Sequence, residues 1–371
     1  MKTDADGRLR KFEVMGLDSR IIGDINLLRM EHNLEAGIKL HRETMKNKRG
    51  RTNDITSYSI DTTINDNNYK NGIREHDTRK AKAITAFVQN TIHLTDKTTV
   101  TPGFRIERYD QKRELHGGGE FPEDITNKTH TTEFIPGIGA THKLSQNVVV
   151  FGGIHKGFAP PRVADAISND GDAVDLDAER STNYELGLRG STDKFQYEAT
   201  LFRLDFKNQV VQATESGGSS TEKTNGGKTL NQGIELSGNV DLGGGFGLGG
   251  NYTYLHTAKL NNTRILDGID RKGNRLSYAP KHLVNLVASY KENDWGSSTR
   301  YSYVSKQFTD LQNTKVGSGD GLTGIIPSYS LVDLNSWYNI NKNATLNLAI
   351  KNIADKKYIS SRAPRGIFPG M

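Results

Sequence analysis

Three basic residues in one polar stretch are the first candidates for binding chemistry. Arg271, Lys272 and Arg275 lie within residues 257–279, which are predicted to form a loop. Guanidinium and ammonium groups bind anions through charge-assisted hydrogen bonds. The spacing therefore predicts an anion-binding loop, although ordinary solvated loop charge is an equally good interpretation.

Two further candidates, Arg74 and His76, lie near the end of another polar stretch. Residues 50–77 are rich in Asn, Asp and Thr, and they separate two strand-like patterns. Such composition between periodic segments indicates a loop. We predict that both residues contribute to ligand binding from this loop.

A third polar stretch, residues 156–180, concentrates carboxylates. Carboxylate oxygens can bind hard cations, but the spacing here differs from that of an EF-hand. A solvated acidic loop is therefore the favoured interpretation. The histidines give no better signal, because none forms a pair at metal-ligand spacing, and no metal site is predicted. The residues concerned are Asp165, Asp170, Asp172, Asp175 and Asp177, and His41, His76, His116, His155 and His256.

Catalytic signatures are absent from the sequence. Residues 245–250 match G-x-G-x-x-G, but Tyr252 and Tyr254 continue a strand-like pattern where a dinucleotide site requires a helix. The chain has no cysteine, which excludes disulfides, thiol nucleophiles and thiolate metal sites. G-x-S-x-G and H-E-x-x-H are also missing. We therefore predict no catalytic residue, no resident cofactor and no enzymatic activity.

The composition excludes several classes of protein. Only 34% of the 371 residues are hydrophobic, the mean hydropathy is -0.63, and the net charge is +6. No apolar run approaches the roughly 20 residues that a membrane helix requires. The charge is too small and too scattered to indicate a nucleic-acid partner. A membrane β-barrel is compatible with these values, because only every second strand residue faces lipid.

Residues 131–189 show the pattern that organises the chain. Residues 133–141 and 148–154 alternate between apolar and polar side chains, and a tight turn at 144–146 separates them. The long polar loop 156–180 and a third alternating segment follow. Period-two alternation with short and long connections in turn is typical of a membrane β-barrel.

The same pattern predicts about fourteen strands over the whole chain. Short turns fall on one side and long loops on the other, whereas a soluble β-sandwich has shorter strands and no such asymmetry. The predicted fold class is all-β, an antiparallel transmembrane β-barrel. The predicted strands are 8–22, 32–49, 78–94, 99–113, 133–141, 148–154, 183–189, 195–211, 229–241, 247–256, 280–291, 297–308, 328–340 and 344–352, with a turn at Gly23-Asp24 and an irregular tail over 354–371.

At several of these positions the sequence resembles TonB-dependent outer-membrane receptors, in particular the siderophore and ferric citrate group. Each matching stretch alone is weak, but their order and spacing agree across most of the chain. The stretches are FIPGIG at 134–139, HKGFAPPR at 155–162, DAERSTNYELGLR at 177–189, LFRLDFKNQV at 201–210, KNIADKKY at 351–358 and RGIFPG at 365–370.

The resemblance implies a 22-stranded barrel with a plugged lumen, in the outer membrane of a Gram-negative bacterium. Residues 1–371 would form a partial receptor β-barrel domain of about fourteen strands, with the plug and the last strand absent. The N-terminus shows no signal-peptide pattern, so an exported protein would begin upstream.

The resemblance also implies the substrate and the partners. A ferric siderophore or ferric citrate would be carried as a chelate, and TonB–ExbB–ExbD would energise uptake through the missing N-terminal region. Outer-membrane lipid, including lipopolysaccharide, would surround the barrel, and lipopolysaccharide phosphate is an alternative partner for Arg271, Lys272 and Arg275. GFAP at residues 157–160 stands where haem receptors carry a Phe-Arg-Ala-Pro box, which favours an iron chelate over haem.

Two functions from other classes stay open at this point. An outer-membrane barrel enzyme, of the phospholipase or protease type, would need a Ser/His or Asp/His constellation at one rim, and no sequence signature supports one. A soluble all-β binding domain would stay monomeric in water without detergent.

Overall fold

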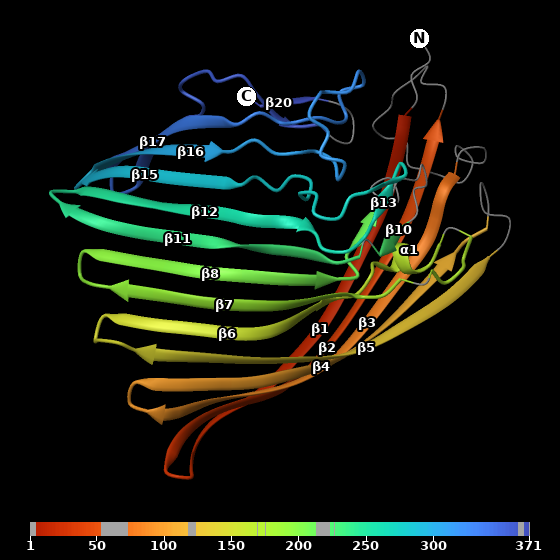
Figure 1. The fold of residues 1–371 in the computed structure, drawn as a ribbon, viewed down its shortest axis with the longest axis horizontal. Coiled ribbons are helices and arrows are strands. Elements are labelled where there is room, and N and C mark those ends of the chain that lie inside the picture. Colours follow the sequence, from red (N-terminus) through yellow and green to blue (C-terminus); the bar gives the residue numbers. More distant parts are fainter. Residues whose placement is uncertain are drawn as a thin grey trace.

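The computed structural model describes residues 5–52, 73–117, 124–168, 170–174, 176–212, 223–225, 227–362 and 367–370. In these residues one antiparallel sheet contains fourteen strands (Figure 1), which confirms the predicted class and the predicted number of strands. The strands are β1 Ala5–Leu27, β2 Met30–Thr52, β3 Ile73–Thr95, β4 Thr98–Leu115, β5 Ile125–Lys143, β6 Val148–Ala159, β7 Glu179–Ser191, β8 Phe195–Lys207, β11 Thr229–Gly243, β12 Phe246–Leu260, β15 His282–Glu292, β16 Trp295–Val304, β17 Tyr329–Asn341 and β18 Ala344–Ile350.

Short elements occupy the connections between the long strands. The helices of the described residues include none that is long and apolar enough to span a membrane. The tail predicted to be irregular forms a small hairpin instead, because Tyr358–Ser361 pairs with Phe368–Gly370. The short elements are α1 Val163–Ala166 and the strand pairs β9 Val210–Gln212 with β10 Lys223–Asn225, β13 Ile265–Leu266 with β14 Ile269–Asp270, and β19 Tyr358–Ser361 with β20 Phe368–Gly370.

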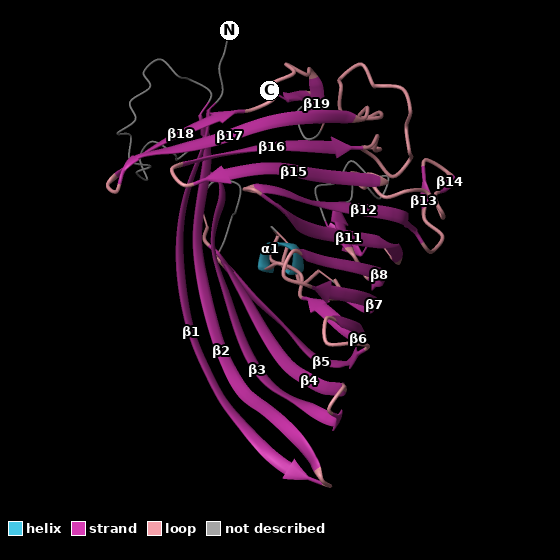
Figure 2. Cartoon of the chain, turned by 90° about the vertical axis from the view of Figure 1, so that its left-hand side faces the viewer, coloured by secondary structure: helices cyan, strands magenta, loops and turns pink. Residues whose placement is uncertain are grey.

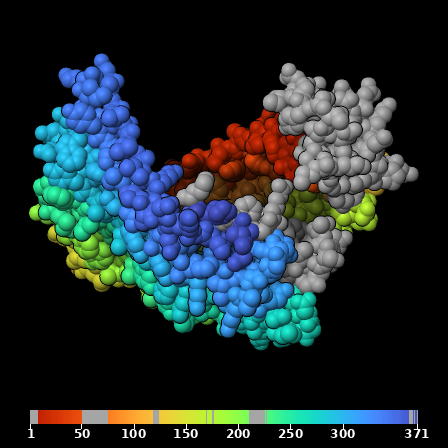
Figure 3. Space-filling view, turned by 90° about the horizontal axis from the view of Figure 1, so that it is seen from above, coloured from red at the N-terminus to blue at the C-terminus, as the bar shows by residue number. Residues whose placement is uncertain are grey.

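The large sheet curls into a trough. Its strand order runs from β1 to β18, and these two are its edge strands. Figure 2 shows the strands curving around a hollow, with α1 inside the curve. Seen from above, the hollow lies between the red N-terminal strands and the blue C-terminal strands (Figure 3). The tight turns gather at one end of the strands and the longer connections at the other (Figure 1), as the sequence predicts.

Side chains point alternately to the two sides of each strand, so the trough has a concave face and an outward face. Ala81 of β3 packs against the α1 connection inside the curve, so residues at odd positions of β3 face the hollow and residues at even positions face outwards. The outward row that contains Ala86 continues directly across the neighbouring strands through Ile38, Ile106 and Phe134. Phe134 is 54% exposed. An outward face covered with exposed apolar side chains is what contact with lipid requires.

The first predicted turn is wrong. Gly23 and Asp24 lie inside β1, and the chain reverses at Leu28 and Arg29, whose φ angles are 54° and 64°. Asp24 is the cross-strand partner of Asn33 in the ladder with β2, and its carboxylate also accepts a hydrogen bond of 2.7 Å from the Asn33 amide. A glycine followed by an acid is therefore not sufficient to end this strand.

Several strands extend further than predicted at the end with the long connections. β2 continues to Thr52, β3 begins at Ile73, and β5 begins at Ile125 rather than at residue 133. The sequences of the extensions are mostly polar, so apolar alternation does not reveal them, but their backbones continue the same ladders. In contrast, β8 and β16 end at Lys207 and Val304, a few residues before the predicted ends.

Candidate functional site

The connection between β6 and β7, residues 160–178, folds back over the concave face of β3 and β4. Val163 and Ile167 in this connection form a buried apolar cluster with Ala81 of β3, and Tyr109 of β4 packs beside them. Ile167 is completely buried. This apolar contact holds the connection against the inner wall of the trough.

Two side chains of β4 hold the same connection through its backbone. Gln111 donates a hydrogen bond of 2.7 Å to the carbonyl of Pro161. Nη1 of Arg113 donates to the carbonyls of Ile167 and Ser168 at 2.6 and 2.8 Å. Both side chains are buried, and their spacing of two residues places them on the same face of the strand. The backbone carbonyls of Pro161, Ile167 and Ser168 thus have hydrogen-bond partners although the connection is packed against the sheet.

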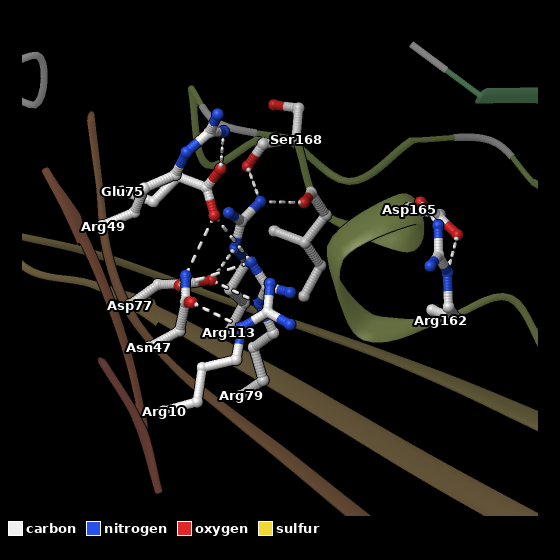
Figure 4. Close-up of polar contacts among 11 residues, drawn as sticks. Arg10, Asn47, Arg49, Glu75, Asp77, Arg79, Arg113, Arg162, Asp165 and Ser168 are labelled. Atoms are coloured by element: carbon white, nitrogen blue, oxygen red, sulfur yellow. Dashed lines mark hydrogen bonds and ion pairs between the residues drawn. The ribbon is translucent and has the colours of Figure 1, made fainter. Parts of the chain in front are cut away.

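Arg113 also belongs to a buried polar network on the concave face (Figure 4). Asp77 is 1% exposed and accepts hydrogen bonds from Nε of Arg113 at 2.7 Å, Nε of Arg79 at 2.6 Å and the Asn47 amide at 2.9 Å. These donors replace the hydrogen bonds to water that the buried carboxylate loses. We call this network the Asp77 cluster; its members are Arg10, Asn47, Arg49, Glu75, Asp77, Arg79 and Arg113.

Glu75 is the second acid of the Asp77 cluster. It accepts hydrogen bonds from Nη1 of Arg49 at 2.8 Å and from the Asn47 amide at 3.0 Å, and it lies 3.7 Å from Arg79. Nε of Arg10 donates to the Asn47 carbonyl oxygen at 3.2 Å. The cluster therefore links β1, β2, β3 and β4 through side chains, and its four guanidinium groups outnumber its two carboxylates.

A cavity of about 540 Å³ opens beside the Asp77 cluster, between β1–β4 and the start of the 160–178 connection. Phe12, Tyr109 and Pro160 contribute apolar surface to it. A half-enclosed cavity with an excess of guanidinium groups favours an anionic ligand. Its charged lining consists of Arg8, Arg10, Arg79, Arg113 and Arg162, with Glu43 and Glu75.

Arg8 and Arg10 are the guanidinium groups of this cavity best placed to contact a ligand. Arg8 is exposed, and Arg10 donates to the neutral amide of Asn47. Neither forms an ion pair with another described residue. Arg162, by contrast, is already paired with Asp165 at 2.7 Å. A bound anion would therefore find two guanidinium groups without a competing carboxylate.

The predicted basic residues Arg271, Lys272 and Arg275 do lie together in the connection between β12 and β15. Arg275, however, has a structural role in that loop: Nε donates to the Ala279 carbonyl at 2.7 Å and Nη2 to the Leu255 carbonyl at 3.1 Å. Burial lowers the pKa of Arg275.

Arg271 differs from Arg275 in its hydrogen bonding. Its Nε is buried without a hydrogen-bond partner among the described residues. Arg271 thus has an unused donor, whereas the guanidinium of Arg275 holds backbone carbonyls.

The predicted loop placement of Arg74 and His76 is wrong, because β3 already begins at Ile73. The His76 ring lies 4.8 Å from the ring of His116. His76 alternates with Glu75 and Asp77 along the strand, so it belongs to the outward face, opposite the Asp77 cluster. A ligand role for Arg74 and His76 stays a prediction.

The residues of the arginine-lined cavity were missed in the sequence, although a signal is present. Arg8 and Arg10, Glu75 with Asp77 and Arg79, and Gln111 with Arg113 repeat charged or amide side chains at every second position. This spacing places each set on one face of its strand. Searching for charge at period two, rather than for charge within loops, would have found them.

The acidic loop gives no sign of a metal site. Among the described residues, no group of three or more His, Asp or Glu side chains is arranged to hold a metal ion. Asp165 is paired with Arg162, and Asp177 accepts a hydrogen bond from the Asn208 amide at 3.2 Å. Asp175 lies outside the described residues.

Comparison with known proteins agrees with this architecture. Residues 5–353 match the family described as TonB dependent receptor-like, beta-barrel. The ferrienterobactin receptor of Escherichia coli (strain K12) is 24% identical over 294 residues, which are 75% of this chain and 37% of that receptor. The unliganded ferric citrate transporter FecA superposes with a TM-score of 0.80 at 21% identity, covering 99% of this chain and 54% of FecA.

The chain therefore belongs to the TonB-dependent receptor-like β-barrel family. Members of this family are outer-membrane proteins of Gram-negative bacteria, and that is the location of this chain. An uncharacterized TonB-dependent receptor of Haemophilus influenzae is 24% identical over 308 residues, 79% of this chain and 77% of that protein. The chain spans about 37% of the length of the ferrienterobactin receptor and 54% of FecA.

Proposed function

We propose that this chain is the barrel portion of an outer-membrane receptor that imports a ferric siderophore or ferric citrate. The observation that carries the proposal is the arginine-lined cavity on the concave face, at the end of the strands where the long connections lie. In bacterial barrels this end faces the exterior. A ligand arriving from outside would approach from the end of the strands where this cavity lies.

The charge of the cavity fits the proposed ligands. Ferric chelates of carboxylate or catecholate groups are anions, and guanidinium groups bind such oxygens through paired hydrogen bonds. Arg8 and Arg10 would contact the chelate, while the Asp77 cluster would position the 160–178 connection beside it. Arg271 and Lys272 would add contacts from the connection between β12 and β15. The chelate would be carried and not transformed, so the protein would not be an enzyme.

The names of related proteins support this class of substrate. They include the ferrienterobactin receptor of Escherichia coli, the ferric citrate transporter FecA and a ferric enterobactin receptor of Pseudomonas aeruginosa. We propose that uptake by the whole protein would be driven through TonB–ExbB–ExbD; the TonB dependence in the family description supports this proposal. The outward face would contact outer-membrane lipid, including lipopolysaccharide.

The test is a calorimetric titration of the refolded chain, in detergent micelles, with ferric citrate and with ferric enterobactin. We expect one of them to bind, and the double variant Arg8→Gln/Arg10→Gln to bind at least about tenfold more weakly. A hydrogen bond to a charged group contributes about 1.5–3 kcal/mol, and about 1.4 kcal/mol corresponds to a factor of ten.

Arg300→Gln is the matched control, because Arg300 is an exposed arginine on β16, well separated from β1 in the order of the sheet. It should leave the affinity unchanged. The variant Arg271→Gln/Lys272→Gln tests the predicted loop contacts separately. A folded wild-type chain that binds neither chelate would refute the proposal.

A further inference from the structure

The outward face of β1–β5 carries a dense band of positive charge that chelate binding on the concave face does not use. Nine cations share this face with three carboxylates. We call these nine residues the basic band: Lys11, Arg42, Lys46, Lys48, Lys80, Lys82, Arg108, Lys112 and Lys128, with Glu13, Asp110 and Glu114 as the acids among them.

The strand register brings like charges directly opposite one another. Lys80, Lys112 and Lys128 are cross-strand partners on β3, β4 and β5. One row away, Arg42 of β2 is the direct partner of Lys82. Like charges in such pairs destabilise a sheet unless carboxylates or another anion lie among them. Asp110, the partner of Lys82 on β4, is one such acid.

The neighbouring acids neutralise only part of the basic band. Glu114 accepts from Lys80 at 2.8 Å and from Lys112 at 2.6 Å. Arg42, Lys46, Lys82 and Lys128 are exposed, and within the described part of the chain no ion pair involves them. These four cations are therefore available to a ligand outside the sheet.

The basic band begins where the apolar outward surface ends. On β2, Ile38 and Leu40 are followed on the same face by Arg42. On β4, Phe104 and Ile106 are followed on that face by Arg108. Residues two apart on a strand are separated by roughly 7 Å, so the first cations lie one step beyond the side chains that contact hydrocarbon.

The basic band also lies on the outer side of the membrane. It occupies the ends of the strands that lead to the long connections, and in bacterial barrels those connections face the exterior. Cations just beyond the hydrocarbon are in reach of phosphates at the headgroup level of the outer leaflet. In a Gram-negative outer membrane the phosphates at that depth belong to lipid A.

We propose that the basic band binds the phosphate groups of lipid A, on the side of the sheet opposite the chelate cavity. Arg42, Lys46, Lys82 and Lys128 hold the phosphates, and the apolar rows of Ile38, Ile106 and Phe134 lie along the acyl chains. This contact anchors the extended strands β1–β5 at the membrane surface. It rests on the outer-membrane location of the chain and not on chelate binding.

The test compares two fourfold variants of the refolded chain in detergent micelles. Arg42→Gln/Lys46→Gln/Lys82→Gln/Lys128→Gln removes the four available cations. Lys97→Gln/Lys143→Gln/Lys194→Gln/Lys291→Gln removes as many exposed lysines near the tight turns. Each protein is titrated with diphosphoryl lipid A, with lipid A lacking its phosphates and with phosphatidylglycerol, and binding is followed by native mass spectrometry. Circular dichroism verifies that both variants keep their β content.

We expect the first variant to bind diphosphoryl lipid A roughly a hundredfold or more weakly, because each of the four cations contributes to the attraction to an anionic lipid surface. The tight-turn variant should bind like the wild type, and added salt should weaken wild-type binding. Equal affinities of the two variants would overturn the proposal. Equal wild-type binding of phosphatidylglycerol, or of lipid A without phosphates, would overturn the assignment to lipid A phosphate.

Discussion

At the scale of single residues, Asp77 holds the candidate site together. It is the common acceptor for Arg79, Arg113 and Asn47. Removing one partner of a buried ion pair leaves the other charge buried and uncompensated, which costs about 3–5 kcal/mol. We expect Asp77→Ala to lower the free energy of unfolding by an amount of that order, measured by urea denaturation of the refolded chain in micelles.

The exposed pair of Arg203 and Asp205 is the control for Asp77. Its distance of 2.9 Å is similar, but the two side chains are 51% and 28% exposed. Solvent screens exposed pairs, which contribute little to stability, so Asp205→Ala should change stability little. If Asp77→Ala and Asp205→Ala lower the free energy of unfolding equally, the burial of Asp77 does not explain its contribution to stability.

At the scale of the element, the connection between β12 and β15 depends on Asp270 of β14. Its Oδ1 accepts hydrogen bonds from the backbone N–H groups of Lys272 at 2.9 Å and Arg264 at 3.0 Å. These bonds hold the pKa of Asp270 below its ordinary value of 3.8. Because the pKa of Asp270 is lower in the folded loop than in the unfolded chain, its ionised carboxylate stabilises the folded loop fully above pH 3.8. This stabilisation of the loop is lost as the pH falls through the folded pKa.

We therefore expect the amides of Arg264 and Lys272 to lose protection from hydrogen exchange in acid. The measurement compares exchange between pH 6 and pH 3 after correction for intrinsic rates. Asp270→Asn should remove this pH dependence, because an amide does not titrate. Asp267→Asn, in the same hairpin, should keep it. Unchanged protection of the wild-type loop at pH 3 would contradict the assignment.

The elements differ in how well the sequence predicts them. Ile84, Ala86 and Val88 alternate clearly, so the membrane part of β3 is found from its apolar period. Glu75 and Asp77 belong to the same strand, but their polar surroundings resemble a loop in composition, and the sequence places them in the predicted loop 50–77. Arg113 and Asp77 are 36 residues apart, and only the pairing of β3 with β4 brings their side chains to 2.7 Å. Strand type is a local property, whereas the site depends on register between strands.

At the scale of the whole molecule, the membrane is what makes the exposed outward face stable. Leu186 lies in the middle of the apolar row of β7 and is 56% exposed. In a soluble sheet an arginine at so exposed a position would be harmless. A charged side chain at the centre of a lipid-facing surface costs about 2–4 kcal/mol, whereas lumen positions tolerate charge.

We therefore expect Leu186→Arg to reduce folding of the chain into phospholipid vesicles by about 2–4 kcal/mol. Glu185→Arg is the control, because the adjacent residue points to the opposite face and is also exposed. The fraction folded is measured by protection from protease across a urea series. A large loss for Leu186→Arg alone identifies the convex face as the lipid-facing surface, since both positions are exposed. Equal behaviour of the two variants would mean that this face does not lie in lipid.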